Sequence, residues 1–217
     1  ILMTELMRWN GADAGALGTV MVALTNPLSF TQQVVVSVDA SILTSGEIGV
    51  LLVRWAPDLV TLVGLADAGD VATEPSGGLL SGAGYAEVSL LVSSDGGTTY
   101  SEIDDARLAS SPVSIRFEGI VAKAASVEVF SHPSDVSDDA TNGLSIDIPS
   151  GIWTKDDVQN VRKRPGAVEA ELTGLSIVAA YHDSPDDSVI RVTPAQYVYG
   201  DIQLGDTAEG TFVVTNV

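Results

Sequence analysis

Clusters of aspartate on predicted loops are the side chains whose type and spacing come closest to chemistry. Carboxylate oxygens carried on loops are the ligands that Ca²⁺ prefers in proteins. Three clusters are candidate Ca²⁺ sites, and two of them are singled out as metal sites, with residues Asp135, Asp138 and Asp139 in the first and Asp183, Asp186 and Asp187 in the second. The remaining cluster is Asp95, Asp104 and Asp105. The alternative is that all three are solvated turns on an acid-rich surface. We expect at most one cluster to bind Ca²⁺, and no other cofactor is predicted.

The first cluster matches an EF-hand loop only in part. Asp138 and Asn142 occupy ligand positions and Gly143 the turn position. Ala140, however, stands where a ligand is needed, and Pro149 stands where the bidentate glutamate belongs. An EF-hand is therefore excluded, although a looser Ca²⁺ site is not.

Side chains for catalysis are scarce. The sequence holds no nucleophile elbow, zinc-protease helix motif, phosphate-binding loop or dinucleotide fingerprint. His132 and His182 are the only histidines, and both are predicted to lie in surface turns. The 29 acidic residues allow a carboxylate pair for glycoside hydrolysis, but no spacing singles one out. We therefore predict that the protein is not an enzyme.

Three consecutive basic residues, Arg162, Lys163 and Arg164, form a candidate binding site. The chain has 29 acidic and 10 basic residues and a net charge of −19, so a positive patch is a natural attachment point for an acidic face of another copy. The alternative is that these are ordinary cations at the end of a helix, where the helix dipole favours them. The sequence leaves both interpretations open.

The overall charge excludes several kinds of partner. A surface of −19 repels DNA, RNA and anionic lipid, so no nucleic-acid partner is predicted. No apolar run reaches the roughly 18 residues of a membrane span, since Arg54 interrupts the best one. An acidic, lysine-poor surface is typical of a protein kept soluble in high salt, and equally of an acidic extracellular protein from an ordinary habitat.

Strands are the elements that must position these groups. Residues 33–65 are the densest run of strand signal and predict three strands, at 33–39, 48–54 and 59–65. The first alternates between apolar and polar residues, as a half-buried strand does. The second is continuously apolar, which favours a strand covered on both faces. Similar patterns predict further strands, at 19–25, 86–93, 112–118, 126–131, 144–148, 169–172 and 175–181, and three last short strands within 189–217.

One helix is predicted, at residues 154–164. Thr154 is a plausible N-cap, Asp156 and Asp157 lie in the first turn, and the basic residues would stand at the end. With about a dozen short strands around it, the expected fold is an all-β sandwich or jelly roll with one short helix.

The domain boundaries follow from glycine-rich breaks and long acidic loops. Residues 1–10 are expected to be an N-terminal arm, which is a short helix, an edge strand or a segment that reaches a neighbouring copy. Residues 11–188 are the sandwich domain. Residues 189–217 are either its closing hairpin or the start of another domain. Long loops are predicted at 67–84, 94–111, 132–143 and 183–188, and loops of this length are usually functional.

Two stretches resemble known β-sandwich families. Residues 34–65, VVVSVDASILTSGEIGVLLVRWAPDLVTLVGL, and 112–129, PVSIRFEGIVAKAASVEV, resemble cohesin-like modules, although Ala56-Pro57-Asp58 departs from that family's order of Asp before Pro. The end of the chain is similar to the start of immunoglobulin-like surface domains at Pro194, Gly200, Gly205 and Asn216, with Tyr199 in place of the usual Phe. Both resemblances imply a binding or structural module.

The expected function is therefore that of a non-enzymatic structural subunit. It would belong to a virion, as a capsid or decoration protein, or to an extracellular surface layer or filament. It would assemble with other copies or companion proteins through strand edges, the arm and loops. The alternative is a cohesin-like module of an exported multidomain protein that binds a protein or a glycan.

Overall fold

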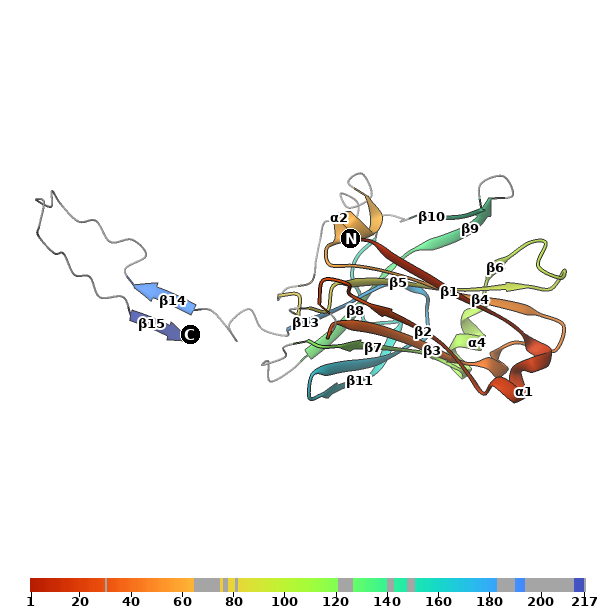
Figure 1. Ribbon diagram of the computed structural model, residues 1–217, viewed down its shortest axis with the longest axis horizontal. Helices are drawn as coiled ribbons and strands as arrows, with labels where there is room; N and C mark the ends of the chain where they lie inside the picture. Colours follow the sequence, from red (N-terminus) through yellow and green to blue (C-terminus); the bar gives the residue numbers. More distant parts are fainter. Residues whose placement is uncertain are drawn as a thin grey trace, which may run out of the picture.

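The computed structural model is a sandwich of two antiparallel β-sheets (Figure 1). This confirms the predicted all-β sandwich. The structure describes residues 1–29, 31–64, 75, 78–80, 82–120, 127–139, 143–147, 151–182, 190–193 and 213–216. For residues 135–139, 143–147, 182, 190–193 and 213–216, it describes the backbone alone.

The first sheet, sheet A, has six strands in the order β1-β4-β5-β13-β8, with β6 beside β5. Its strands are β1 (Met3–Asn10), β4 (Ile48–Ala56), β5 (Tyr85–Ser93), β6 (Ser101–Glu102), β8 (Val127–Pro133) and β13 (Ser176–His182). Strand β1 pairs with β4 of its own chain over eight consecutive residue pairs, from Met3↔Trp55 to Asn10↔Ile48. Of the options for residues 1–10, an edge strand is the one that the structure contains.

The second sheet, sheet B, has five strands in the order β11-β12-β7-β3-β2. Its strands are β2 (Thr19–Thr25), β3 (Gln33–Asp39), β7 (Val113–Glu118), β11 (Val158–Arg164) and β12 (Ala167–Leu172). Two hairpins form sheets of their own, β9 (Asp135–Asp139) with β10 (Gly143–Asp147) and β14 (Ile190–Thr193) with β15 (Val213–Asn216). The described helices are all short: η1 (Gly11–Asp13), α1 (Ala14–Leu17), η2 (Ala40–Ile42), α2 (Leu59–Val63) and α4 (Asp105–Ser110).

Alternating side chains from the two sheets fill the space between them. In β2, Val20, Val22 and Leu24 are buried, while the residues between them are exposed. Because successive side chains of a strand point to opposite faces, one face of β2 packs the core and the other meets solvent. Strand β7 shows the same alternation. The half-buried strands that the sequence predicts at these positions are confirmed.

Sheet A is covered on its outer face as well as its inner one. Strands β4 and β5 are buried at nearly every position. A second apolar cluster covers one end of this outer face, and its buried members are Ala56, Leu59, Leu62, Tyr85, Trp153, Ile177, Ala179 and Tyr181. The continuous apolar run at 48–54 predicts a strand covered on both faces, and the structure confirms it.

The predicted strand at 59–65 is wrong, because Leu59–Val63 is the helix α2. The Asp58 carboxylate accepts hydrogen bonds from the Thr61 amide and the Thr61 hydroxyl, both at 2.8 Å, which caps the first turn. Leu59 and Leu62, three residues apart, are buried on one helix face. The β-branched residues between them favour a strand locally, and tertiary packing overrides that preference.

The predicted helix at 154–164 is also wrong, because Val158–Arg164 is the strand β11. This segment pairs antiparallel with β12, with a bulge between Gln159 and Arg162, and Asn160 in the bulge has a φ of 53°. Arg162 lies opposite Glu169 in the register. Arg164 forms an ion pair with Glu169 across the two strands, so strand pairing accommodates a cation that a helix dipole would also favour.

The long loops are only partly loops. Residues 94–111 contain β6 and the helix α4, which begins at its cap Asp104. Within residues 132–143, Asp135–Asp139 is the strand β9. Most of the predicted loop at 67–84 and all of the one at 183–188 lie outside the described residues. So does one of the three strands predicted after residue 188.

Candidate functional site

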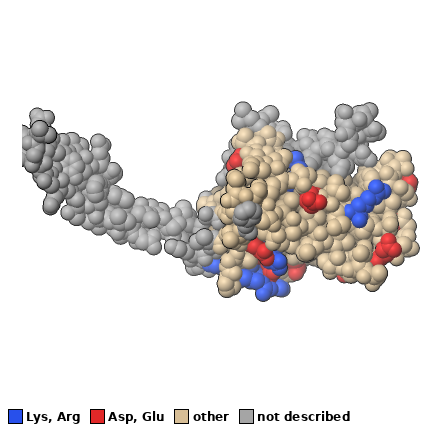
Figure 2. Space-filling model, in the orientation of Figure 1, with Lys and Arg blue, Asp and Glu red and all other residues tan. Residues whose placement is uncertain are grey.

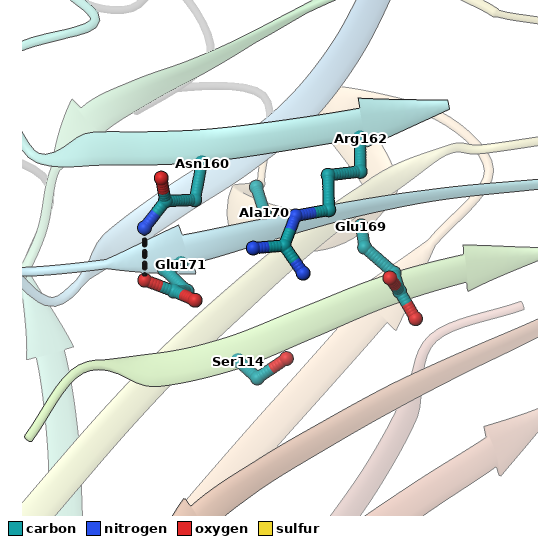
Figure 3. Close-up of a pocket in the computed structure, with 6 residues that line it drawn as sticks. All are labelled: Ser114, Asn160, Arg162, Glu169, Ala170 and Glu171. Atoms are coloured by element: carbon teal, nitrogen blue, oxygen red, sulfur yellow. Dashed lines mark hydrogen bonds between the residues drawn. The ribbon is translucent and has the colours of Figure 1, made fainter. Parts of the chain in front are cut away.

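The outer face of sheet B is an open, polar surface built by β7, β11 and β12. Figure 3 shows Ser114, Asn160, Arg162, Glu169 and Glu171 converging on it from these three strands. They line a shallow hollow of about 90 Å³, which is room for a few water molecules. Asn160 donates a hydrogen bond to Glu171 at 2.6 Å across the two strands.

The basic residues predicted as a binding site lie at the edge of this face, on β11. The strand divides them, because Arg162 and Arg164 share one face and Lys163 points to the other. Arg164 forms an ion pair with Glu169 at 2.7 Å, and its side chain is 56% exposed. Within the described part of the chain, Arg162 forms no ion pair. The structure therefore leaves one exposed guanidinium available to a partner.

Asp95 and Asp104, which the structure describes in full, hold a turn and a helix cap. Asp95 accepts hydrogen bonds from the backbone of Thr98 and Thr99 and from the hydroxyls of Ser93 and Thr99. The Thr99 amide, followed by the two hydroxyls, holds the pKa of Asp95 well below its usual range. Asp104 caps α4 by accepting from the Ala106 amide at 2.7 Å. These are structural roles.

Among the described residues, no group of three acidic or histidine side chains is placed to hold a metal ion. Asp95, Asp104 and Asp105 therefore do not form the predicted cluster. The other two candidate Ca²⁺ clusters remain untested by this observation. Asp135, Asp138 and Asp139 lie on β9, where the backbone alone is described. Asp183, Asp186 and Asp187 lie outside the described residues.

Sequence reasoning misplaced one histidine. His132 lies in β8 and is fully buried, not in a surface turn, and its ring packs edge-on to Trp153 at 5.5 Å. Trp153 also packs against Tyr85 and Tyr181, at 6.1 and 6.2 Å. The apolar alternation of Val127 and Val129 places His132 on the opposite face of the strand, so this pattern gives no signal of its burial. His182 is the last residue of β13.

Sequence reasoning also missed a buried carboxylate. Glu87 on β5 is fully buried and pairs with Arg54 of β4 at 3.2 Å, while the Ser89 hydroxyl donates to it as well. Burial raises the pKa of Glu87, and the hydrogen bond from Ser89 and the charge of Arg54 oppose that rise. The pair lies on the covered outer face of sheet A, where a charge needs a partner.

One side of the sandwich, the closed side, is formed by the adjacent edges of β8 and β11 and the linking residues 151–157. The linker adds a bridge to the edge of β8, because Ser131 and Thr154 exchange two backbone hydrogen bonds of 2.9 Å. Lys155 forms an ion pair with Glu128 of β8 and lies 5.1 Å from the Phe130 ring centre. The backbone edge of β8 is therefore partly occupied.

The opposite side, the open side, is formed by the adjacent edges of β1 and β2. Among the strands that the structure describes, each is the last of its sheet and pairs with one neighbour. Leu6 and Met7 of β1 are 52% and 44% exposed, and Met21 of β2 is 55% exposed. Figure 2 shows that the surface over these two strands carries few charged groups, although the net charge of the chain is −19. This is a sparsely charged, partly apolar strip on an acidic protein.

The comparisons with known proteins identify no family for the chain. It matches no family model, no curated protein and no solved structure. What is shown is the two-sheet antiparallel sandwich itself. In the described part of the chain, no helix is long and apolar enough to cross a membrane.

Proposed function

We propose that the protein is a non-enzymatic structural subunit of a large assembly, either a virion capsid or decoration protein or a subunit of an extracellular surface layer or filament. The observation that carries this proposal is the open side. A strand edge with unused backbone hydrogen-bonding groups and exposed apolar side chains is a template for pairing with another chain. Soluble monomers ordinarily blunt such an edge.

The proposal requires more than one kind of contact. A two-fold contact alone closes a dimer, and a larger assembly needs a second, different interface. The face of sheet B supplies a candidate, because Arg162 and Arg164 project from β11 on a chain with a net charge of −19. Such a cationic spot attracts an acidic surface of another copy.

The test is the mass of the native protein in solution, followed by electron microscopy of negatively stained material. We expect species much larger than one chain, and their amount should rise with protein concentration. A monomer at every concentration and salt level would contradict the proposal. Replacing Arg162 and Arg164 with Glu should reduce the largest species without unfolding the chain, while unchanged assembly would remove the role of this basic spot.

A second candidate is a cohesin-like recognition module of an exported multidomain protein. The open polar face of sheet B favours it, because Ser114, Asn160 and Glu171 present hydrogen-bonding groups on a flat surface. Such a surface suits a protein partner or a glycan. A chain that stays monomeric and captures one partner, with binding lost in Asn160→Ala, would support recognition over assembly.

A further inference from the structure

Strand β1 exposes an apolar side chain on each of its two faces. Met7 shares a face with Trp9, which is buried in the core, while Leu6 lies on the outer face. Both Leu6 and Met7 are nonetheless about half exposed, at 52% and 44%. Among its eight residues, Trp9 alone is buried. An edge strand with apolar side chains exposed on both faces has the form of an incomplete interface.

We propose that β1 pairs antiparallel with β1 of a second copy, so that the two six-stranded sheets join into one continuous sheet. This inference rests on the proposed function and identifies one contact between two subunits of the proposed assembly. The occupant is a strand, because the exposed edge of β1 offers a row of backbone N–H and C=O groups at the spacing that another strand matches. The unbroken register with β4 keeps that row straight.

The distribution of charge favours the open side over other surfaces as the place where two copies meet. Two chains of −19 repel each other over most of their surfaces, so they approach best where charge is low. The open side is such a surface in Figure 2. The charges that β1 itself carries, Glu5 and Arg8, are of opposite sign and cancel along the strand.

Symmetry then limits the register of the pair. A two-fold axis normal to the joined sheet makes one residue of β1 face its own copy. Centring the pair on Glu5 or Arg8 would place like charges directly opposite each other, which is destabilising. Centring it on Leu6 sets Leu6 opposite its own copy on one face, and centring it on Met7 does the same for Met7 on the other face. Neither register places like charges opposite each other. The axis therefore passes at Leu6 or Met7.

The other edges suit this contact less well. Strand β2 alternates between buried and exposed residues, so it presents apolar groups on its outer face at Met21 but lacks the second exposed face. Strand β11 carries three cations and a bulge, which are the features that prevent edge pairing. Strand β8 is bridged by Thr154. Strand β1 is the remaining edge.

Cross-linking tests the register. The chain has no cysteine, so a single introduced cysteine can form only an intermolecular disulfide. Residues that face each other in an antiparallel pair have Cα atoms roughly 4.5–5.5 Å apart, within disulfide range. We expect mild oxidation to convert either Leu6→Cys or Met7→Cys to a covalent dimer, and Val161→Cys on β11 to stay monomeric. Equal cross-linking of all three would overturn the register.

Matched lysine variants test the contact itself. Leu6→Lys and Met21→Lys change equally exposed residues on neighbouring edges, and both lower the net negative charge, so general repulsion cannot explain a loss. We expect Leu6→Lys to weaken self-association at least about tenfold by sedimentation, from lost apolar burial in both copies. Met21→Lys should change it less than about twofold, and circular dichroism should show both variants folded.

The possible outcomes separate this inference from the proposed function. Assembly lost in Leu6→Lys and kept in Met21→Lys supports both. Assembly that is equal in the unaltered protein and in Leu6→Lys overturns the β1 pairing and leaves the structural role standing. A monomer in the unaltered protein at every concentration, tested from low salt to 1 M NaCl, overturns both.

Discussion

The two sides of the sandwich treat their strand edges in opposite ways. On the closed side, β8 is bridged by Thr154, and β11 carries a bulge and three cations. On the open side, β1 keeps an unbroken register and exposes Leu6 and Met7. The chain thus protects one pair of strand edges and leaves the other pair available for pairing with another chain. The proposed assembly depends on this asymmetry.

The largest expected effect is on the closed side, at Trp153. Its side chain is 8% exposed and packs against Tyr85, His132 and Tyr181. Trp153→Ala should lower the free energy of unfolding by about 3–5 kcal/mol, because it leaves a cavity among these rings. The measurement is urea denaturation of the monomer.

The matched variant on the open side is Leu6→Ala. In the monomer this substitution should lower the free energy of unfolding by less than about 0.5 kcal/mol, because the Leu6 side chain is 52% exposed. Equal decreases in the free energy of unfolding for Trp153→Ala and Leu6→Ala would contradict the difference between the closed and the open side.

An intermediate effect is expected at the bulge of β11. Asn160 has a φ of 53°, a left-handed conformation that costs a β-branched residue about 1–2 kcal/mol. Asn160→Val should destabilise the chain by that amount, and Asn160→Gly should not, although both remove the hydrogen bond to Glu171. Thermal unfolding compares the two variants. If their melting temperatures agree, the bulge is not held in this conformation.

The smallest effect concerns the middle of sheet A, between the two sides. Burial raises the pKa of Glu87 above its ordinary 4.5, so the folded chain binds this proton more tightly than the unfolded chain. The free energy of unfolding should therefore fall as pH rises from about 4.5 through the raised pKa, and level off above it. Urea denaturation at a series of pH values measures this slope.

Two variants sharpen the pH experiment in opposite directions. Glu87→Gln removes the titrating group and should flatten the slope. Ser89→Ala removes a hydrogen bond that lowers the pKa, so the fall should extend to higher pH. Parallel pH curves for all three proteins would show that Glu87 is not held in a desolvated pair.

Period-two alternation was sufficient to predict much of the fold. Val34, Val36 and Val38 reveal β3, and the continuous apolar run at 48–54 reveals that β4 is covered on both faces. The predictions failed where local and long-range signals conflict. Leu59–Val63 is rich in β-branched residues and yet forms α2, because the Asp58 cap and the packing of Leu62 decide its conformation.

The candidate site was harder to predict than the fold. The binding role of the basic residues at 162–164 stays a prediction, and an isolated sequence cannot show that Glu169 lies opposite Arg162 across a strand pair. The sequence predicts residues 1–10 as an arm or edge strand, but it cannot show that Leu6 and Met7 are both exposed, because their exposure depends on how the two sheets pack. Edge position is a property of the whole sandwich.

Amide hydrogen exchange along β1 tests the central claim most directly. The protein would be labelled at low and at high concentration, and the exchange of peptides covering Met3–Asn10 and Val158–Arg164 compared by mass spectrometry. Pairing on the open side predicts slower exchange in Met3–Asn10 at high concentration, with Val158–Arg164 less affected, because amides at the free edge of β1 gain hydrogen-bond partners. Assembly at high concentration with unchanged exchange in Met3–Asn10 would contradict it.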